Sequence, residues 1–301
     1  MQRVIISGAS GLVGTSLCDL LSKNGYEVCI LSRTSNPKSR NRTYVWDIKK
    51  GFIEGGALKN VDYIIHLAGA GIGDEKWTDQ RKKVIVDSRV DSAQLLFDKC
   101  KELNIKPKAF ISSSAVGWYG AITSEKIFDE TDPFYDDFLG NTCKVWEDAA
   151  DQFDALGSRV VKLRTGVVLA KNGGALKKLV PLVKSGFGSA VGTGNQYMPW
   201  VHIDDLCQMY LKALKDDKMV GAYNAVTNDF QSNQSFMKTM AKVLGKPFFM
   251  PKVPSFLLKI ILGEQAVIIL EGSRVSANKV LKNGFKFQFP KLGEALKDLE
   301  L

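Results

Sequence analysis

The sequence predicts an α/β fold in which a doubly wound parallel sheet is joined to a smaller, interleaved α+β substrate lobe. Short β-branched and aromatic runs alternate with helical patterns from Arg3 to about Arg164, which is the arrangement of βαβ units. Runs such as Tyr63–Leu67 are apolar on both faces, as expected of strands that helices cover on each side. A glycine-rich segment, Ser7–Gly14, follows the first run and begins a helix, which is typical of the first βα turn of such sheets.

Six strands are expected in the first part of the chain. They cover Val4–Ile6, Val28–Leu31, Tyr44–Trp46, Tyr63–Leu67, Ala109–Ser112 and Val160–Leu163. Beyond them, glycine-rich loops surround a helix expected at Ala175–Lys184, and the segment Ala222–Val226 is expected to return to the main sheet as a strand. We therefore expect a Rossmann domain at residues 1–165, with a return at about 198–226, and a smaller lobe at residues 166–197 and 227–301.

Composition restricts the classes of partner. The net charge is +9, yet lysine and arginine are spread through segments that also carry acidic residues, which argues against nucleic acid binding and suits a phosphorylated ligand. Apolar stretches such as Pro254–Leu262 are far shorter than a membrane span, and no signal peptide is expected. Five scattered cysteines indicate reduced thiols, and the sequence shows no set of metal ligands. We expect a soluble, cytoplasmic protein with no metal site and no membrane partner.

The strongest local motif is Ser7–Gly14, whose glycines have G-x-x-G-x-x-G spacing. Glycines at these positions let the chain turn tightly and let backbone N–H groups approach a diphosphate at the N-terminus of the helix. The residues expected to line a dinucleotide here are Gly8, Ser10, Gly11, Leu12 and Val13. The alternative is a glycine-rich turn that binds no ligand.

The end of the second expected strand indicates which dinucleotide binds. This strand ends Leu31-Ser32-Arg33 and lacks the acidic residue that would hydrogen-bond the ribose hydroxyls of NAD. Arg33 instead offers a guanidinium to a 2′-phosphate, so the sequence favours NADP(H) as cofactor. Arg40 and Arg42 could share this role, and a solvated loop arginine is the alternative.

Longer motifs resemble those of one protein family. The glycine spacing and the run Ser112–Gly120 resemble the extended branch of the short-chain dehydrogenase/reductase superfamily. Other motifs are similar to its NAD(P)-dependent epimerase-like subfamily, which has human and bacterial members and a C-terminal tail of the DUF1731 type. They are Lys76-Trp77-Thr78, Asp87-Ser88-Arg89, Cys143–Glu147, Leu163–Leu169, Trp200–Asp205 and Asn283–Phe287. The resemblance covers nearly the whole chain.

The resemblance implies further contacts with the cofactor. It places the acidic residue Asp47 by the adenine. It places Leu67, Ala68 and Gly69 where their backbone lies against the cofactor, and Ser112 near the nicotinamide. Arg164 is expected to clamp an anionic group of the cofactor, with structural pairing as the alternative. His66 alternates within an apolar strand, and we interpret it as a packed core histidine rather than a catalyst.

The catalytic residues are harder to assign, because the superfamily's usual Tyr-x-x-x-Lys pair is absent. None of the eight tyrosines has a lysine four residues later, and the two positions fall on Leu139 and Cys143. Ser114 is the candidate for polarising a substrate carbonyl or hydroxyl, with capping of the strand end as the alternative. Tyr119 could replace the missing tyrosine as proton donor, or it could pack structurally. Lys144 is expected to face away, because it lies about 100° further round the helix.

The second lobe supplies the expected substrate contacts. The resemblance places Gln196, Trp200 and His202 beside the substrate cleft. Asp204 or Asp205 is expected to cap the helix that follows.

Two functions are consistent with these motifs. The first is an NADP(H)-dependent oxidoreductase or epimerase that acts on a small polar substrate, free or nucleotide-linked, with Ser114 orienting the oxygen and Tyr119 or a water carrying the proton. The second is a non-catalytic NADP(H)-binding sensor or regulator that lost turnover together with the Tyr/Lys pair. Relatives of this kind often form homodimers, so a homodimer is a further expectation.

Overall fold

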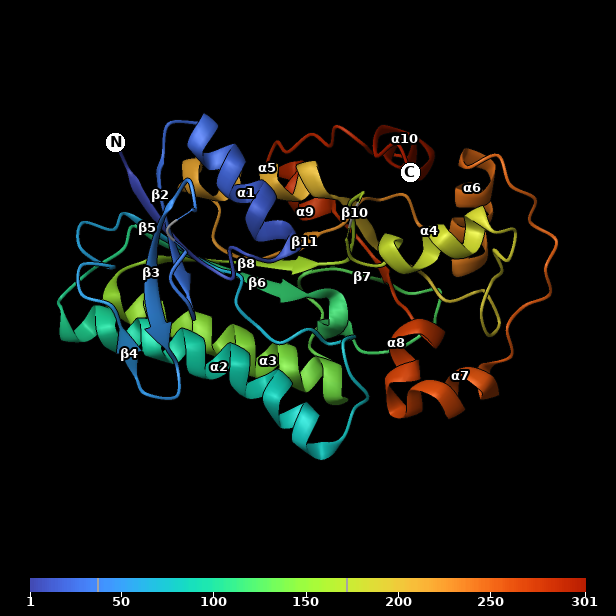
Figure 1. The fold of residues 1–301 in the computed structure, drawn as a ribbon, viewed down its shortest axis with the longest axis horizontal. Coiled ribbons are helices and arrows are strands. Elements are labelled where there is room, and N and C mark those ends of the chain that lie inside the picture. The colour runs from blue at the N-terminus through green and yellow to red at the C-terminus, as the bar shows by residue number, and fades with distance from the viewer. Residues whose placement is uncertain (37, 172) are drawn as a thin grey trace.

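Helices cover both faces of one large sheet in the computed structural model, which describes residues 1–36, 38–171 and 173–301 (Figure 1). The sheet has eight strands in the order β11-β8-β6-β5-β1-β2-β3-β4. Their bounds are β1 Arg3–Ser7, β2 Glu27–Ser32, β3 Arg42–Asp47, β4 Phe52–Ile53, β5 Tyr63–His66, β6 Ala109–Ala115, β8 Arg159–Thr165 and β11 Gly221–Ala225. Neighbouring strands are parallel, except that β4 runs antiparallel to β3. The predicted α/β fold with a doubly wound sheet is confirmed.

The sheet changes its direction of growth at β1. From β1 the chain adds β2 and β3 on one side, and it later adds β5, β6, β8 and β11 on the other. In doubly wound sheets the carboxyl ends of the strands at such a switch point leave a crevice for a ligand. The strand register places Ser7, Leu31 and His66 next to one another at this edge.

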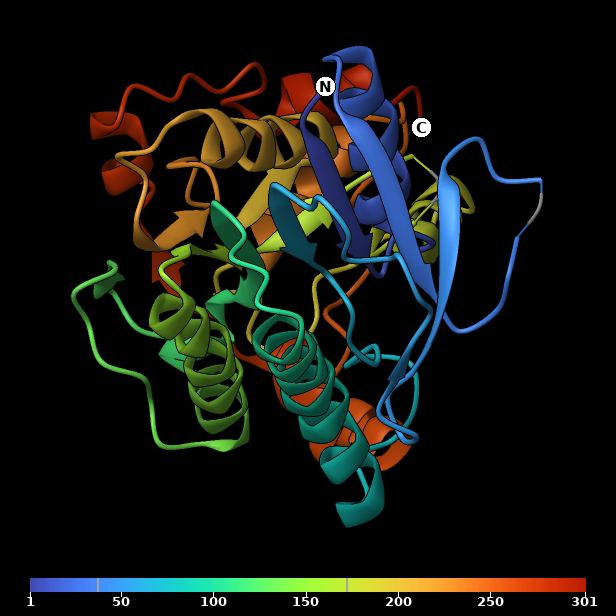
Figure 2. The ribbon, with the colours of Figure 1, turned by 90° about the vertical axis from the view of Figure 1, so that its left-hand side faces the viewer.

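Alternate residues of β1 enter two hydrophobic cores. Val4 and Ile6 join the core that contains α1 (Leu12–Lys23) and α5 (Ile203–Lys215). Ile5 joins the core on the other face, which contains α2 (Asp79–Glu102) and α3 (Phe138–Asp151). Figure 2 shows these two helical layers on opposite sides of the twisted sheet. Burial on both faces explains why the strand sequences are continuous apolar runs.

The smaller lobe lies beyond the carboxyl ends of the main strands, at the right of Figure 1. It contains two short parallel pairs, β10–β9 and β12–β7. Their bounds are β7 Ile127–Phe128, β9 Val167–Leu169, β10 Trp200–His202 and β12 Arg274–Val275. The remaining helices are α4 Leu176–Lys184, α6 Asn233–Val243, α7 Ser255–Leu262, α8 Val267–Leu270, α9 Asn278–Lys282 and α10 Leu292–Asp298, with 3-10 turns η1 Val116–Tyr119, η2 Gln152–Leu156 and η3 Gly263–Ala266.

The elements predicted from sequence periodicity are present. All six expected strands, the first helix and the helix at Ala175–Lys184 form, and the strand expected at Ala222–Val226 is β11, which pairs with β8. The short strands β4, β7, β9, β10 and β12 were not expected, because two or three residues are too few to show an alternation. The five cysteines are buried and unpaired. Over the described ranges, no helix has both the length and the apolar character that crossing a membrane requires.

Candidate functional site

The loop between β1 and α1 is shaped by its glycines. Gly8 has a φ of 74°, and a Cβ on it would lie 2.7 Å from the backbone carbon of Leu67. A Cβ on Gly14 would lie 2.5 Å from the Cα of Ala9. Both distances are shorter than any normal van der Waals contact, so the loop fits against β5 and α1 fits against the loop only with glycine at these positions.

The N-terminus of α1 offers backbone donors to a ligand. Gly11 is the N-cap residue, and no side chain caps the helix. The N–H groups of the first helical turn have no acceptor within a helix, so Leu12 and Val13 present theirs at the carboxyl edge of the sheet. Ser10 is exposed beside them. A Cβ on Gly173 would lie 2.4 Å from Leu12, so the smaller lobe borders the same loop. The loop and helix end fit a dinucleotide diphosphate.

The residues predicted to select NADP(H) are exposed, and Arg33 follows the carboxyl end of β2, whereas Arg42 pairs with Cys29 in the middle of that strand. Arg33 and Arg40 are exposed, and Arg42 is exposed at the start of β3, where its guanidinium stacks on Tyr44 at 4.8 Å. Asp47 ends β3 and accepts a hydrogen bond from the backbone N–H of residue 50. Pro37, between Arg33 and Arg40, lies outside the described residues.

His66 is a core residue, as predicted. Its Nδ1 lies 2.7 Å from Ser7 Oγ and its Nε2 lies 3.0 Å from Ser92 Oγ, and the ring is fully buried. Burial lowers the pKa of His66 to about 4. The ring is therefore neutral near pH 7 and ties the ends of β1 and β5 to α2.

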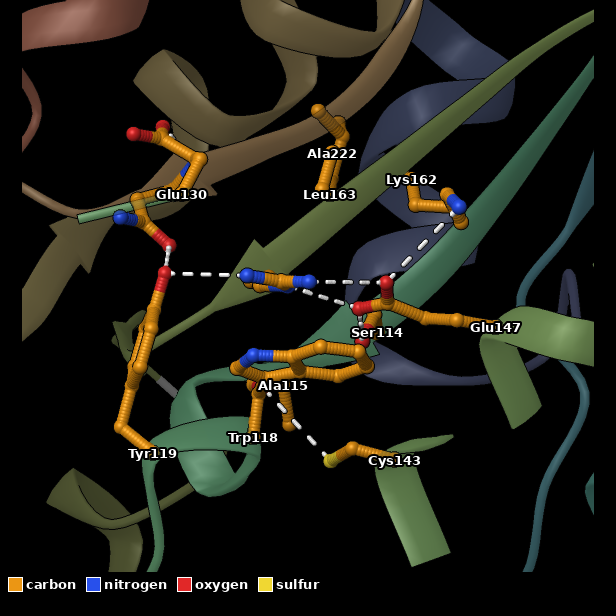
Figure 3. A network of polar contacts seen from close by, with 12 residues as sticks. Ser114, Ala115, Trp118, Tyr119, Glu130, Cys143, Glu147, Lys162, Leu163 and Ala222 are labelled. Atoms are coloured by element: carbon orange, nitrogen blue, oxygen red, sulfur yellow. Dashed lines mark hydrogen bonds and ion pairs between the residues drawn. The ribbon is translucent and has the colours of Figure 1, made fainter. Parts of the chain in front are cut away.

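A buried polar network lies where β6, β8 and β11 end (Figure 3). It consists of Ser114, Tyr119, Glu147, Arg164 and Asn224, all of which are buried. The strand register aligns Ser114, Arg164 and Asn224 in one row across three neighbouring strands. Glu147 reaches this row from α3 and Tyr119 reaches it from η1. Residues far apart in the sequence thus meet at one point.

Arg164 is at the centre of this buried polar network. Its Nε donates to Glu147 Oε1 at 2.8 Å, its Nη2 donates to Oε2 at 3.0 Å, and its Nη1 donates to the Tyr119 hydroxyl at 3.2 Å. Its guanidinium also lies 3.7 Å from the centre of the Trp118 ring. Burial works to lower the pKa of Arg164, but its hydrogen bonds with Glu147 outweigh this and the pKa is raised. The structure thus shows the structural pairing that was the alternative to a clamp on the cofactor.

The two candidate catalytic hydroxyls also have partners in the network. The Ser114 hydroxyl donates to Glu147 Oε1 at 2.7 Å, and the Tyr119 hydroxyl donates to Asn224 Oδ1 at 2.8 Å. Burial raises the pKa of Tyr119 well above its usual range, and the side chain is fully buried. Tyr119 therefore packs structurally. Ser114 has lone pairs left to accept a hydrogen bond, whereas its proton is engaged. Ser112 is also buried, and its hydroxyl donates to the backbone carbonyl of Ser113.

Helix α3 carries no charge at the position of the missing lysine. The Cys143 thiol donates to the carbonyl of Ala115 at 3.6 Å, and burial raises the pKa of Cys143 to about 12, so the thiol is neutral. Leu139 packs close to Gly117. Lys144 pairs with Asp148 one helical turn further on, and the prediction that it faces away is confirmed.

Two predicted substrate residues have structural partners. Gln196 is buried, and its Nε2 donates to the carbonyls of Val191 and Ile269 at 3.1 and 2.9 Å. Trp200 is fully buried in the core, with its indole N–H donating to the carbonyl of Asp229. These contacts give no support to a substrate role for either side chain.

His202 caps α5, and Asp205 binds the C-terminal segment to this helix. Its Nδ1 accepts the backbone N–H of Asp204, so His202 is the N-cap of α5, and the expectation that Asp204 or Asp205 caps it is wrong. The Asp205 carboxylate instead accepts the backbone N–H groups of Gln288–Phe289. His202 Nε2 lies 3.5 Å from Asp298 Oδ2. Because Nδ1 accepts a hydrogen bond, the neutral ring carries its proton on Nε2, which makes no hydrogen bond among the described residues.

Sequence reasoning missed Asn224 and the pairing of Glu147. Asn224 lies between Tyr223 and Ala225, which is a signal for a buried polar partner, whereas Glu147 is followed by the charged Asp148 and gives no such signal. The smaller lobe also has a pocket of about 750 Å³ between the loop at Gly192 and helices α7 and α8, lined in part by Lys259, Glu264 and Glu271.

Comparison with known proteins agrees with the predicted fold. Residues 4–225 match the NAD dependent epimerase/dehydratase family and residues 253–299 match DUF1731, a domain of unknown function. The chain is 33% identical to Epimerase family protein SDR39U1 of Homo sapiens, over 99% of both chains, and 35% identical to Epimerase family protein YfhF of Bacillus subtilis, over 99% of this chain and 98% of that one.

Solved structures give the same assignment. The crystal structure of human SDR39U1 (isoform2) with NADPH superposes with a TM-score of 0.89 at 32% identity, over 99% of both chains. A nucleoside-diphosphate sugar epimerase from Corynebacterium glutamicum superposes with a TM-score of 0.78 at 31% identity, over 99% of this chain and 58% of that one. The chain therefore belongs to the NAD dependent epimerase/dehydratase family and carries a C-terminal DUF1731 domain.

Proposed function

We propose that the protein binds NADP(H) at the switch point of the sheet and acts as an oxidoreductase or epimerase on a small polar substrate. The glycine loop supports the first part most directly, because Gly8 and Gly14 let the loop pack tightly against the end of β5 and against α1, as in the first βα turn of dinucleotide-binding sheets. Arg33, in place of an acidic residue, supports NADP(H) over NAD(H). The human relative was crystallised with NADPH, which supports the same cofactor.

Several residues of this chain would hold the cofactor. The N–H groups of Leu12 and Val13 would bind the diphosphate, and Arg33 would bind the 2′-phosphate. The backbone of Leu67–Gly69, which lies against Gly8, would border the cofactor at the end of β5. The bound nicotinamide would supply or accept a hydride.

The buried polar network restricts how a proton moves in this reaction. Tyr119 donates to Asn224 and has a raised pKa, so it is not the proton donor that the Tyr-x-x-x-Lys pair usually supplies. Ser114 donates to Glu147 and is left as an acceptor, so it would orient a substrate hydroxyl rather than polarise a carbonyl. A water at the edge of the crevice would carry the proton. The substrate is nucleotide-linked in the Corynebacterium relative by its description, and we propose the same class here.

A second candidate function is a non-catalytic NADP(H) sensor. The observation that favours it is that both candidate hydroxyl protons are engaged inside the protein. The two functions predict different results when purified protein is loaded with NADP⁺ or NADPH and mixed with nucleotide-sugars, free sugars and carbonyl compounds. A change of nicotinamide absorbance that Ser114→Ala slows supports the enzyme. Tight binding of NADPH with no absorbance change for any compound supports the sensor.

A further inference from the structure

Helix α7 is apolar, yet it contributes no buried residue. Six of its eight side chains are apolar, and none of them belongs to either hydrophobic core. Four of the six, Phe256, Leu257, Ile260 and Ile261, are 40–72% exposed. Single apolar side chains on a surface are ordinary, but a contiguous set of large ones marks a contact with another molecule.

The four exposed side chains form one face of α7. With about 100° between successive residues of a helix, they fall within an arc of about 140°. Leu258 and Leu262 lie on the other side of the helix and are half-buried. Lys259 is exposed at the edge of the apolar face. Helix α7 therefore lies on the surface of the smaller lobe and turns its more apolar face outward.

Two segments beside α7 also expose aromatic side chains. Phe249 is 74% exposed in the loop between α6 and α7, which forms the right-hand end of the molecule in Figure 1. Phe187 is 65% exposed just after α4. The two segments run side by side, because the backbone N–H of Val253 donates to the carbonyl of Ala190. We call the surface that they form with α7 the apolar-basic surface, and it consists of residues 177–188 and 246–261.

The apolar-basic surface carries positive charge without counter-ions. Its two segments contain six lysines and no acidic residue. The six are exposed, and they are Lys177, Lys178, Lys184, Lys246, Lys252 and Lys259. In the described part of the smaller lobe, the lysines that pair with a carboxylate are Lys171 and Lys291, which lie outside this surface. Glu264, the first acidic residue after α7, pairs with Lys82 of α2.

An anionic bilayer has the chemistry that this surface requires. Exposed aliphatic and aromatic side chains enter the boundary between headgroups and acyl chains, and lysines around them bind lipid phosphates. A second copy of the chain that docked face to face would bring six lysines against six lysines, which is unfavourable. We propose that the apolar-basic surface docks on membranes that contain anionic lipids. The inference goes beyond the proposed function and does not rest on it.

The proposal differs from the sequence-based expectation of no membrane partner. That expectation rested on length, because the apolar run at Pro254–Leu262 is far too short to span a bilayer. A helix that lies in the interface needs only an exposed apolar face with lysines beside it. The sequence does not show this, because the exposure of α7 and its proximity to the loop after α4 are set by the tertiary structure.

The test is sedimentation of the full-length protein with lipid vesicles, at low and at high salt. One kind of vesicle is phosphatidylcholine alone, and the other contains about one third phosphatidylglycerol, which is anionic. Phe256→Ser/Ile260→Ser removes two exposed apolar side chains of α7. Lys252→Glu/Lys259→Glu reverses two of the charges.

Two matched controls change exposed residues of the same kinds outside the apolar-basic surface. They are Phe52→Ser/Leu103→Ser and Lys101→Glu/Lys106→Glu. The Tm of every variant is measured, and the oligomeric state of the wild type and of the serine variant of α7 is measured by analytical ultracentrifugation.

We expect the wild type to sediment with the anionic vesicles and not with phosphatidylcholine alone, and to do so less at high salt. The serine variant and the glutamate variant of the apolar-basic surface are each expected to bind the anionic vesicles about tenfold or more weakly, because each loses two contacts with the bilayer. Both controls are expected to bind like the wild type. All variants are expected to keep the wild-type Tm, because the substituted side chains are exposed.

Three results overturn the proposal. One is that the wild type sediments with neither kind of vesicle. Another is that the serine variant of α7 binds as well as its control, which would place the contact elsewhere. The third is a wild-type dimer that the serine variant dissociates and that does not sediment with vesicles, which would assign the surface to a second copy. None of these measurements involves NADPH, so a failure of the proposed function is distinguished from a failure of this inference.

Discussion

Arg164 and Glu147 form a two-pronged ion pair in the interior, with nitrogen–oxygen distances of 2.8 and 3.0 Å. Their side chains are only 4% and 3% exposed, so solvent does not screen the pair. The pair fixes the direction in which the hydroxyls of Ser114 and Tyr119 donate. The pair therefore affects both the stability of this edge of the sheet and the proton transfers that the Ser114 and Tyr119 hydroxyls can make.

Removing Arg164 leaves the buried Glu147 carboxylate with Lys162 as its counter-charge, at 3.9 Å and without a hydrogen bond. We expect Arg164→Met to lower the free energy of unfolding by about 3–5 kcal/mol, measured by urea denaturation. The double variant Arg164→Met/Glu147→Leu is expected to recover part of this loss. Lys144→Met, which removes a surface pair on the same helix, is the control and is expected to cost less than about 1 kcal/mol. Equal effects of Arg164→Met and Lys144→Met would contradict the buried pair.

Tyr119→Phe tests whether the tyrosine is structural. It removes one donor to Asn224 and one acceptor for Arg164, so we expect a loss of about 1–2 kcal/mol in stability. The Kd for NADPH and the rate on any substrate that is found are expected to change less than about threefold. A rate loss of a hundredfold or more without loss of stability would restore Tyr119 as the proton donor.

His66 makes stability depend on pH on the acid side. Its pKa is about 4 in the folded protein and about 6.5 in the unfolded chain, so the unfolded chain binds more protons below pH 6.5. The contribution of neutral His66 to the free energy of unfolding is fully present above pH 6.5. As the pH falls toward 4, the free energy of unfolding decreases by roughly 3 kcal/mol. His66→Gln is expected to flatten this part of the profile relative to the wild type. Parallel profiles for the two proteins over this acidic range would show that His66 does not carry the effect.

The glycine loop permits a matched pair of substitutions. Gly8 and Gly25 both have positive φ, but only at Gly8 would a Cβ meet backbone, at 2.7 Å. Gly8→Ala and Gly25→Ala are each expected to lose about 1 kcal/mol or more from strain, and Gly8→Ala more than Gly25→Ala. Only Gly8→Ala is expected to weaken NADPH binding, by at least about tenfold in a fluorescence titration. Equal NADPH affinities for both variants would place the dinucleotide elsewhere.

Arg33→Ala tests the selection of the 2′-phosphate. We expect it to raise the Kd for NADPH by about tenfold or more, because a charge-assisted hydrogen bond is lost, and to leave the Kd for NADH unchanged. The ratio of the two constants is the measured quantity, and NADH binding is the internal control. If the ratio stays at its wild-type value, the 2′-phosphate is bound by other residues such as Arg40 or Arg42.

Local patterns explain what the sequence could predict. The strands β1, β2, β5, β6 and β8 are buried on both faces, so each is visible as an apolar run. The first βα turn is equally local, because the steric demands on Gly8 and Gly14 come from residues within the motif and from the end of β5. The fold class and the glycine loop follow from such patterns.

The buried polar network could not be predicted in this way. Ser114, Arg164 and Asn224 share a row only because β6, β8 and β11 pair in one register, and no spacing in the sequence encodes that register. The same limit applies to His202, whose ring caps α5 while Asp205 binds the C-terminal segment. Family motifs singled out Ser114, Arg164 and His202 but not Asn224, and only the tertiary structure shows which partner each one has.

The central claim is that the switch point of the sheet binds NADP(H), and the most direct test is a fluorescence titration of the purified protein with NADPH and with NADH. We predict saturable NADPH binding with a Kd at least about tenfold lower than that for NADH, as expected for one charge-assisted contact with the 2′-phosphate. Binding of neither dinucleotide, or equal binding of both, would contradict the assignment of this site to NADP(H).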